Sequence, residues 1–177
     1  MQMERLIISL FLFCYCVQIN AQQYIAKAGE ISFFSNAPLE DIAAVNNKVS
    51  AVYDVQTHEL VFQLNISDFI FPNALMQTHF NENYLESDVF PKSTFVGKVI
   101  ENKNGIAHVE GNLTIHGETN FITVEGNLFI NEDVVLISDV QFIIKLKNYK
   151  IKIPKIVMYK VAEEIEVKVN IELILKE

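Results

Sequence analysis

Apolar and polar residues alternate along most of this chain, which is the pattern of strands with one face against a core. The clearest case is Glu164 to Leu175, where Ile, Val or Leu occupies every second position from Ile165 onward. Gly or Asn marks most reversals, and Asn104-Gly105 is a strong signal for a tight hairpin. The pattern predicts strands over Gln22–Ala26 and Glu30–Ser35 (separated by a turn at Lys27-Ala28-Gly29), Lys48–Asp54, Leu60–Ser67, Thr94–Glu101, Ile106–His116, Glu118–Ile130, Val134–Leu146 and Glu164–Leu175.

Helical spacing replaces this alternation in the middle of the chain. Met76, Phe80 and Tyr84 recur at four-residue intervals and Leu85 completes an apolar stripe, so the sequence predicts a short amphipathic helix. The helix must end before Pro91, because proline lacks a backbone N–H and restricts the residue before it. Over Pro38–Asn47 a single helical turn and an irregular segment are equally compatible with the spacing of the apolar residues.

The number and length of these strands favour a closed sheet. Long antiparallel strands leave unpaired backbone groups at the sheet edges unless the sheet closes on itself. About eight strands is the size at which a barrel either fills with its own side chains or holds one small ligand. We therefore expect an all-β fold, an eight-stranded antiparallel β-barrel with one or two short helices, in which the central helix is a plug or a lid.

The first residues differ from the rest of the chain and predict a secretory signal peptide over residues 1–21. Arg5 precedes an uncharged run from Leu6 to Val17, and Ala21 offers a small residue at the cleavage position. The run is shorter than the roughly 20 residues that a membrane-spanning helix needs. We therefore expect an exported protein whose single domain comprises residues 22–177, with no transmembrane span after cleavage.

Charge and cysteine content bear on two questions, whether the protein binds nucleic acid and whether disulfides or thiolate metal sites stabilise it. A formal net charge of -8 and a pI near 5.0 argue against nucleic acid as a partner, because phosphate binding needs clustered Lys and Arg. Both cysteines, Cys14 and Cys16, lie inside the predicted signal segment. The exported domain would then have no disulfide and no thiolate metal site, so its hydrophobic core must hold it together.

Candidate catalytic and metal-ligating residues do not form a recognisable site. His108, Glu110 and His116 lie on one predicted strand, but residues eight positions apart are about 27 Å apart in an extended chain, too far for one ion. The chain has no Gly-x-Ser-x-Gly nucleophile elbow and no glycine-rich phosphate loop, and Ser67-Asp68 and Ser138-Asp139 are isolated pairs. We therefore expect no enzyme activity, no metal and no cofactor, and an exported hydrolase lacks a nucleophile to support it.

Three segments resemble the YceI-like family. They are Phe33 to Ile42, with Ala37-Pro38-Leu39-Glu40-Asp41-Ile42; Thr78 to Gly97, with Asn81-Glu82-Asn83-Tyr84-Leu85-Glu86-Ser87, Phe90-Pro91-Lys92 and Phe95-x-Gly97; and Gly111 to Thr119, with Leu113-Thr114-x-x-Gly117. The resemblance implies an eight-stranded, lipocalin-like barrel, periplasmic or secreted. It also implies a long apolar cavity that binds a polyisoprenoid or a similar isoprenoid-tailed lipid.

The many aromatic residues, 13 Phe and 6 Tyr, have two interpretations. One is a non-enzymatic protein that binds an isoprenoid or other long-chain lipid in the barrel. The other is a solid-core structural or partner-binding barrel in which the same rings pack together, and the sequence also allows a homodimer. For the first interpretation, the candidate cavity-lining residues are Phe62, Leu64, Phe95, Leu113, Phe121, Phe129, Phe142 and Val169 from the strands, with Met76, Phe80 and Tyr84 from the helix as a cap.

Overall fold

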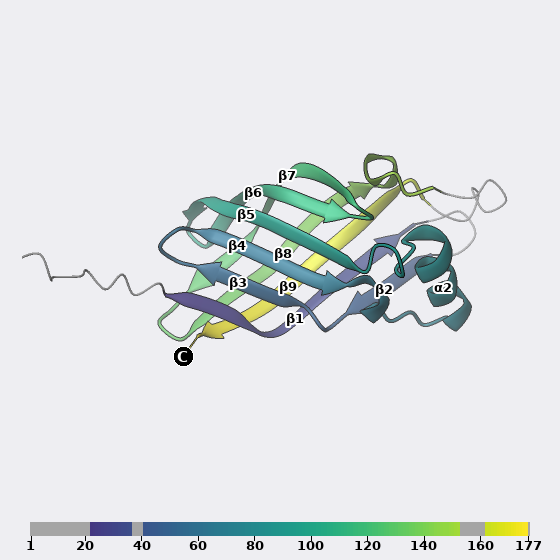
Figure 1. The fold of residues 1–177 in the computed structure, drawn as a ribbon. Coiled ribbons are helices and arrows are strands. Elements are labelled where there is room, and N and C mark those ends of the chain that lie inside the picture. Colours follow the sequence, from purple (N-terminus) through teal and green to yellow (C-terminus); the bar gives the residue numbers. More distant parts are fainter. Residues whose placement is uncertain (1–21, 37–40, 153–161, 177) are drawn as a thin grey trace, which may run out of the picture.

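The computed structural model of the protein describes residues 22–36, 41–152 and 162–176 (Figure 1). The predicted signal segment lies outside these residues. No helix of the described ranges is long and apolar enough to cross a membrane. The elements in chain order are β1 (Gln23–Ser35), β2 (Ile42–Asn46), β3 (Ser50–Asp54), β4 (Glu59–Asn65), the 3-10 helix η1 (Ile66–Asp68), the α-helix α2 (Ala74–His79), the π-helix η2 (Phe80–Tyr84), β5 (Lys92–Lys103), β6 (Ile106–Ile115), β7 (Glu118–Ile130), β8 (Val134–Lys145), the 3-10 helix η3 (Leu146–Tyr149) and β9 (Glu164–Leu175).

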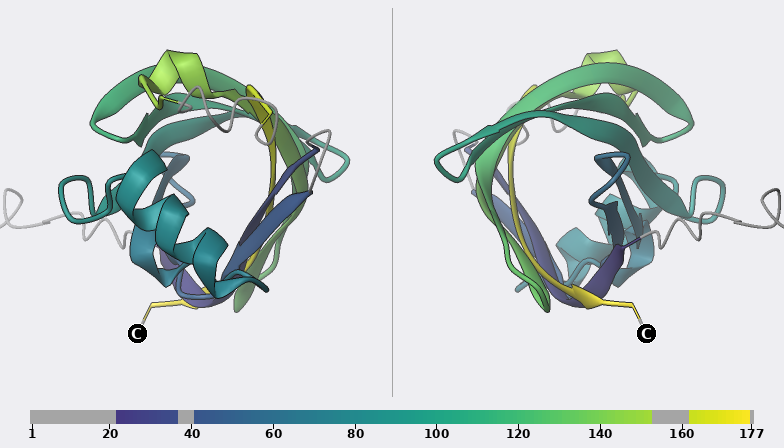
Figure 2. Two further views of the ribbon diagram at one scale, coloured as in Figure 1. Left: turned by 90° about the vertical axis from the view of Figure 1, so that its right-hand side faces the viewer. Right: turned by 90° about the vertical axis from the view of Figure 1, so that its left-hand side faces the viewer.

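Eight of the strands close into an antiparallel barrel in the order β1-β3-β4-β5-β6-β7-β8-β9, because β9 returns to pair with β1 (Figure 2). β1 is long enough to have two neighbours on its other edge. Its first residues, Gln23–Ile25, pair with β3, and its last residues, Ile31–Ser35, pair with the additional strand β2. The predicted all-β, eight-stranded antiparallel barrel is confirmed.

Two local predictions near the N-terminus are wrong. Gln22–Ala26 and Glu30–Ser35 belong to one strand, because a bulge between Ala26 and Ala28 accommodates the residues where we predicted a turn. In the segment with an ambiguous helical turn, Ile42–Asn46 is a strand, since these residues pair in register with the end of β1. Residues 37–40 of that segment lie outside the described ranges.

The predicted central helix is present as α2 followed by η2. Its start is capped by the Asn73 side chain, whose Oδ1 accepts from the backbone N–H groups of Leu75 and Met76 at 2.9 and 3.3 Å. Its last turn widens to π geometry, with the Leu85 N–H donating to the Phe80 carbonyl at 2.9 Å. The two helical segments lie across part of one end of the barrel (Figure 2, left).

The opposite end of the barrel is filled by its own side chains. Tyr24 and Tyr53, paired across β1 and β3, are each only 1% exposed, and Leu173 beside them is fully buried. The Tyr24 hydroxyl donates to the backbone oxygen of Asn131 at 2.9 Å, which ties β1 to the turn between β7 and β8. This end therefore has a solid core.

Candidate functional site

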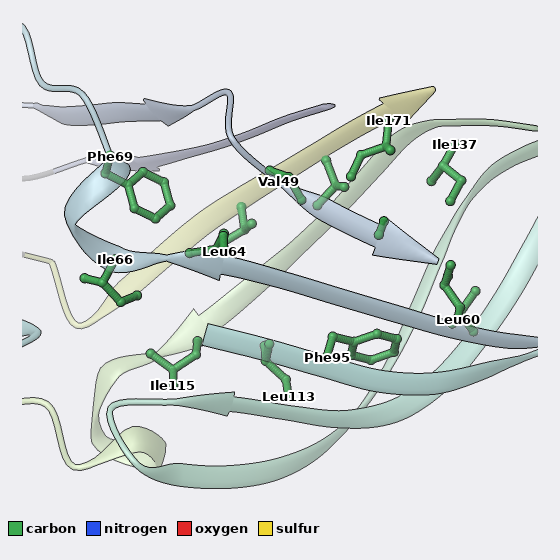
Figure 3. Packing of buried hydrophobic residues seen from close by; sticks show 14 of the residues in the cluster. Val49, Leu60, Leu64, Ile66, Phe69, Phe95, Leu113, Ile115, Ile137 and Ile171 are labelled. Atoms are coloured by element: carbon green, nitrogen blue, oxygen red, sulfur yellow. The ribbon is translucent and has the colours of Figure 1, made fainter. Parts of the chain in front are cut away.

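A cavity of about 220 Å³ occupies the half of the barrel next to α2 and η2. Its wall comes from β1, β2, β4 to β9 and the helical segments, and Figure 3 shows Leu60, Leu64, Phe95 and Leu113 on one side with Ile137 on the facing side. The volume lies just below the range of about 300–1,000 Å³ that is common for small-molecule pockets. The space therefore suits a slim ligand rather than a bulky one.

The cavity wall is almost wholly apolar. The polar side chains on it include Ser35, Gln63, Ser93 and Thr94. Ser93 Oγ donates to the Thr114 carbonyl at 2.9 Å, and Ser35 Oγ accepts from a backbone N–H at 3.3 Å, so both hydroxyls already have protein partners. Among the described residues no charged side chain lines the cavity. Burial of apolar surface would therefore supply most of the affinity for a ligand, and a charged group inside would lack a counter-ion.

All but two of the residues predicted to line a cavity lie on its wall. They are Phe62, Leu64, Phe95, Leu113, Phe142 and Val169 from the strands and Met76, Phe80 and Tyr84 from the helical segments. Their shared position follows from strand alternation and from the helix crossing the barrel end. Contact between these side chains and a ligand stays a prediction.

Phe121 and Phe129 are the exceptions, and their assignment to the cavity is corrected here. Both rings lie on the outer surface of β7, where they are 66% and 53% exposed. The neighbouring residues Ile122 and Val124 line the cavity instead. Thr123, Glu125 and Asn127 lie between the two rings on the same face of β7, so the alternation of the strand favours the other face as the inward one.

An aromatic cluster at the helix end of the cavity was not predicted. Phe80 of η2 packs on Phe33 of β1 and on Phe69 and Phe71, with ring centroids 5.5, 5.6 and 4.9 Å apart. Two hydrogen bonds between Val45 and Ile70 hold the segment of Phe69 and Phe71 against β2. These contacts fix the helix over the cavity. Alternation around the exposed Ile70 was the signal that could have indicated Phe69 and Phe71.

Tyr84 is the cavity residue whose ionisation is perturbed. Burial raises the pKa of its hydroxyl above the ordinary value, because the phenolate would lose its hydration. The hydroxyl is therefore protonated at neutral pH, and it can donate a hydrogen bond to a ligand without placing a charge at the cavity wall.

His116 connects three segments near the same end. It lies in the turn between β6 and β7, and its Nε2 is 2.8 Å from Glu86 Oε2 in the segment that follows η2. Its Nδ1 is 3.2 Å from the backbone oxygen of Tyr149 in η3, and its ring packs on Phe90 at a centroid distance of 4.4 Å. The side chain is 11% exposed. His116 therefore holds the helical segments to the barrel rim.

The other candidate ligands for a metal ion remain apart. His108 lies 3.4 Å from Glu125 on the neighbouring strand β7. Within the part of the chain that the structure describes, no three His, Cys, Asp or Glu side chains come together in a geometry that could hold an ion.

The family model of the YceI-like domain matches residues 25–173. The chain belongs to the YceI-like family. The match runs from β1 into β9, so it includes all of the walls of the cavity and the helical segments across it. The resemblance of Thr78 to Gly97 and the other two segments to YceI-like proteins is thereby confirmed. The search of curated proteins finds no match.

Three solved structures share the YceI-like fold. A polyisoprenoid binding domain from Saccharophagus degradans implicated in plant cell wall breakdown is 10% identical, with a TM-score of 0.74 over 89% of this chain and 100% of that one. BcnA from Burkholderia cenocepacia is 16% identical, with a TM-score of 0.71 over 81% and 95%. The YCEI protein of Campylobacter jejuni is 18% identical, with a TM-score of 0.62 over 81% and 85%. At these identities the likeness establishes the fold.

Proposed function

We propose that this YceI-like protein is a non-enzymatic binding protein that holds the tail of a polyisoprenoid or another long-chain lipid in its cavity. The observation that carries the proposal is the apolar space between the helix-covered end and the filled end of the barrel, without a charged side chain among the described lining residues. Burial contributes about 25 cal/mol per Å², so a tail that buries about 300 Å² gains roughly 7 kcal/mol before the cost of ordering it.

Two of the comparisons support this proposal. The chain belongs to the YceI-like family, and one solved structure of the same fold is described as a polyisoprenoid binding domain. The slim cavity and its apolar wall fit a flexible hydrocarbon tail by size and by chemistry.

The test combines native mass spectrometry with uptake of a prenyl probe. The protein is purified without detergent, and its mass is measured before and after mild organic extraction. We expect extractable lipid, and saturable uptake of a dansyl-labelled farnesyl probe that unlabelled farnesol displaces. A protein with no extractable lipid and no probe uptake would contradict the proposal and favour the solid-core structural or partner-binding barrel.

We also propose that the protein is exported to the periplasm or secreted, with residues 1–21 removed as a signal peptide. The uncharged run after Arg5 and the small residue Ala21 support this proposal. Expression of the full chain in a Gram-negative host, followed by fractionation and intact-mass measurement, tests it. We expect a periplasmic species beginning at Gln22, whereas a full-length cytoplasmic species would contradict export.

A further inference from the structure

The segment that leads into α2 carries exposed apolar side chains at the helix-covered end of the barrel. Ile70 is 58% exposed and Leu75 is 64% exposed, and Pro72 and Ala74 between them are exposed as well. Figure 1 shows α2, which this segment enters, at the right-hand end of the barrel. We call residues 70–75 the apolar loop. A cluster of exposed apolar side chains of this kind indicates an interaction surface.

The residues beside these exposed side chains line the cavity. Phe69 and Phe71, on either side of Ile70, are 6% and 7% exposed and lie on the cavity wall. Met76, next to Leu75, lies on the same wall. The segment therefore presents one set of apolar side chains to the cavity and another to the solvent. A hydrocarbon in contact with Ile70 is separated from the cavity by the thickness of this one segment.

The charges along this part of the chain favour an uncharged partner. No Asp, Glu, Lys or Arg occurs between Asp68 and Glu82. The next charged residues, Glu82, Glu86 and Asp88, are exposed carboxylates, and the whole chain has a formal net charge of -8. Negative charge beside the apolar loop opposes its approach to an anionic lipid surface, which attracts Lys and Arg. The apolar loop itself has no charge to desolvate.

The backbone of the apolar loop forms hydrogen bonds within the protein where its side chains are most exposed. Ile70 and Val45 exchange two backbone hydrogen bonds, with N···O distances of 2.8 and 3.1 Å. Pro72 has no N–H group, and the Leu75 N–H donates to Asn73 Oδ1 at 2.9 Å. Hydrocarbon requires such internal bonding, because it offers no hydrogen-bond partner. Recognition of an extended peptide would instead use open backbone groups, so the apolar loop suits a lipid surface better.

We propose that the apolar loop docks on a bilayer of zwitterionic lipid, with Ile70 and Leu75 inserted among the acyl chains, and that the bound tail enters and leaves the cavity there. Transfer through water would expose the whole tail, whereas transfer at a docked loop keeps it in apolar surroundings. Docking as a step of ligand exchange rests on the proposed lipid-binding function. Attachment to a bilayer does not, so the two are measured separately.

The first test is flotation of the purified protein with phosphatidylcholine vesicles. Wild type is compared with the double variant Ile70→Ser/Leu75→Ser. The matched control is Val96→Ser/Phe121→Ser, because Val96 and Phe121 are 56% and 66% exposed on the outer wall of β5 and β7. Each buried methylene contributes about a fourfold gain in affinity. We therefore expect the loop variant to bind vesicles at least roughly tenfold more weakly than wild type, and the control to bind within about twofold of it.

The second test follows transfer of a lipid from the bilayer. A dansyl-labelled geranylgeranyl probe is loaded into the same vesicles, and its arrival in the protein is measured by fluorescence. We expect the loop variant to take it up at least roughly tenfold more slowly than wild type and the control. All three proteins should bind the farnesyl probe added from solution within about twofold of one another, since none of the four substituted residues lines the cavity.

The outcomes separate the two proposals. If wild type takes up the farnesyl probe but does not float with phosphatidylcholine vesicles, or floats only when phosphatidylglycerol is added, docking on zwitterionic lipid is contradicted while lipid binding stands. An equal loss of flotation in the loop variant and the control also contradicts docking through the apolar loop. If wild type floats but binds no probe, the lipid-binding proposal fails and only membrane attachment stands. Circular dichroism of each variant checks that it is folded.

Discussion

At the scale of single residues, Asp54 shows how one carboxylate organises the turn between β3 and β4. Its Oδ1 accepts from the backbone N–H groups of Thr57 at 2.9 Å and Gln56 at 3.0 Å, and its Oδ2 accepts from the Gln23 side chain at 3.5 Å. The hydrogen bond from the Thr57 backbone, with smaller contributions from the others, holds the pKa of Asp54 below its ordinary value.

We expect Asp54→Ala to lower the free energy of unfolding at pH 7 by about 1 kcal/mol, because two turn N–H groups lose their acceptor. Since the pKa is lower in the folded chain, the carboxylate's contribution is complete above the unfolded pKa of about 3.9 and is lost as pH falls through the folded value. Urea unfolding of both proteins over a series of pH values measures this. A difference between them that stays constant into strong acid would contradict the assignment.

The two misassigned phenylalanines show how a pair of large rings can mislead a face assignment. In β7 the set that begins at Phe121 continues with Thr123, Glu125 and Asn127, whereas the set that begins at Ile122 continues with Val124, Gly126 and Leu128. The alternation therefore favours Ile122 on the inward face, and the prediction followed the two rings instead. Phe129 lies on the outside, where its ring covers Gly105 so closely that a Cβ at that glycine would be 2.6 Å from it. That contact joins residues far apart in the chain, and no local pattern encodes it.

At the scale of elements, the helical segments α2 and η2 have an inner and an outer face. Phe80 of η2 packs into the aromatic cluster on the cavity wall, whereas Leu75 of the preceding α2 is 64% exposed. The same substitution, to aspartate, can therefore be compared at an inward and at an outward position of these adjoining segments.

We expect Phe80→Asp to reduce uptake of the farnesyl probe at least roughly tenfold, because a carboxylate at the cavity wall would be desolvated without a partner. Leu75→Asp should leave uptake within about twofold of wild type, since its side chain stays in water. Fluorescence titration gives the affinities, and circular dichroism should show the same β content in both. Equal uptake by the two variants would contradict the role of the helix as a cover.

The contact between His116 and Glu86 holds the segment after η2 against the barrel rim. Loss of this contact should therefore change the rate at which a ligand leaves the cavity more than it changes the fold. We expect Glu86→Ala to speed release of the bound probe severalfold, because the segment after η2 loses its 2.8 Å contact with the imidazole. Glu86→Gln, which retains a hydrogen-bond acceptor, should change the rate less. Stopped-flow displacement measures both rates, and identical release from all three proteins would show that the contact does not restrain the cover.

Elements with strong local signals were predicted well. The strand Glu164–Leu175 has the predicted bounds, because its strict alternation extends over its whole length. The hairpin at Asn104-Gly105 is present, with positive φ angles of 54° and 85° that such turns require. The bulge in β1 was missed, because Lys27-Ala28-Gly29 has the composition of a turn and only pairing with β9 keeps it extended.

At the scale of the whole molecule, the barrel divides into a filled end and a hollow end. Closure through β1 and β9 was predictable, because long antiparallel strands leave no stable edge. The division was not, because it depends on how side chains from non-adjacent strands fill the interior. The family resemblance of the three segments indicated a cavity, but which half of the barrel contains it follows from the packing of Tyr24, Tyr53 and Leu173 at the other end.

This division predicts that stability and binding can be changed separately. We expect Tyr24→Phe to lower the free energy of unfolding by about 1 kcal/mol, because the hydroxyl no longer donates to the backbone oxygens of Asn131 and Glu132. Uptake of the farnesyl probe should stay within about twofold of wild type, since Tyr24 does not line the cavity. Urea unfolding and fluorescence titration test the two statements, and a parallel loss of both properties would contradict the division.

The hollow end has one more consequence, which concerns the stability and turnover of the protein. Side chains around an empty space forgo dispersion contacts that a hydrocarbon would supply, so a bound tail would complete the interior as a missing side chain does. At a free concentration of one hundred times Kd, such a guest would add about 2.7 kcal/mol to the folded state. Unloaded copies would then melt first and be degraded first, and the amount of intact protein would follow the supply of its guest.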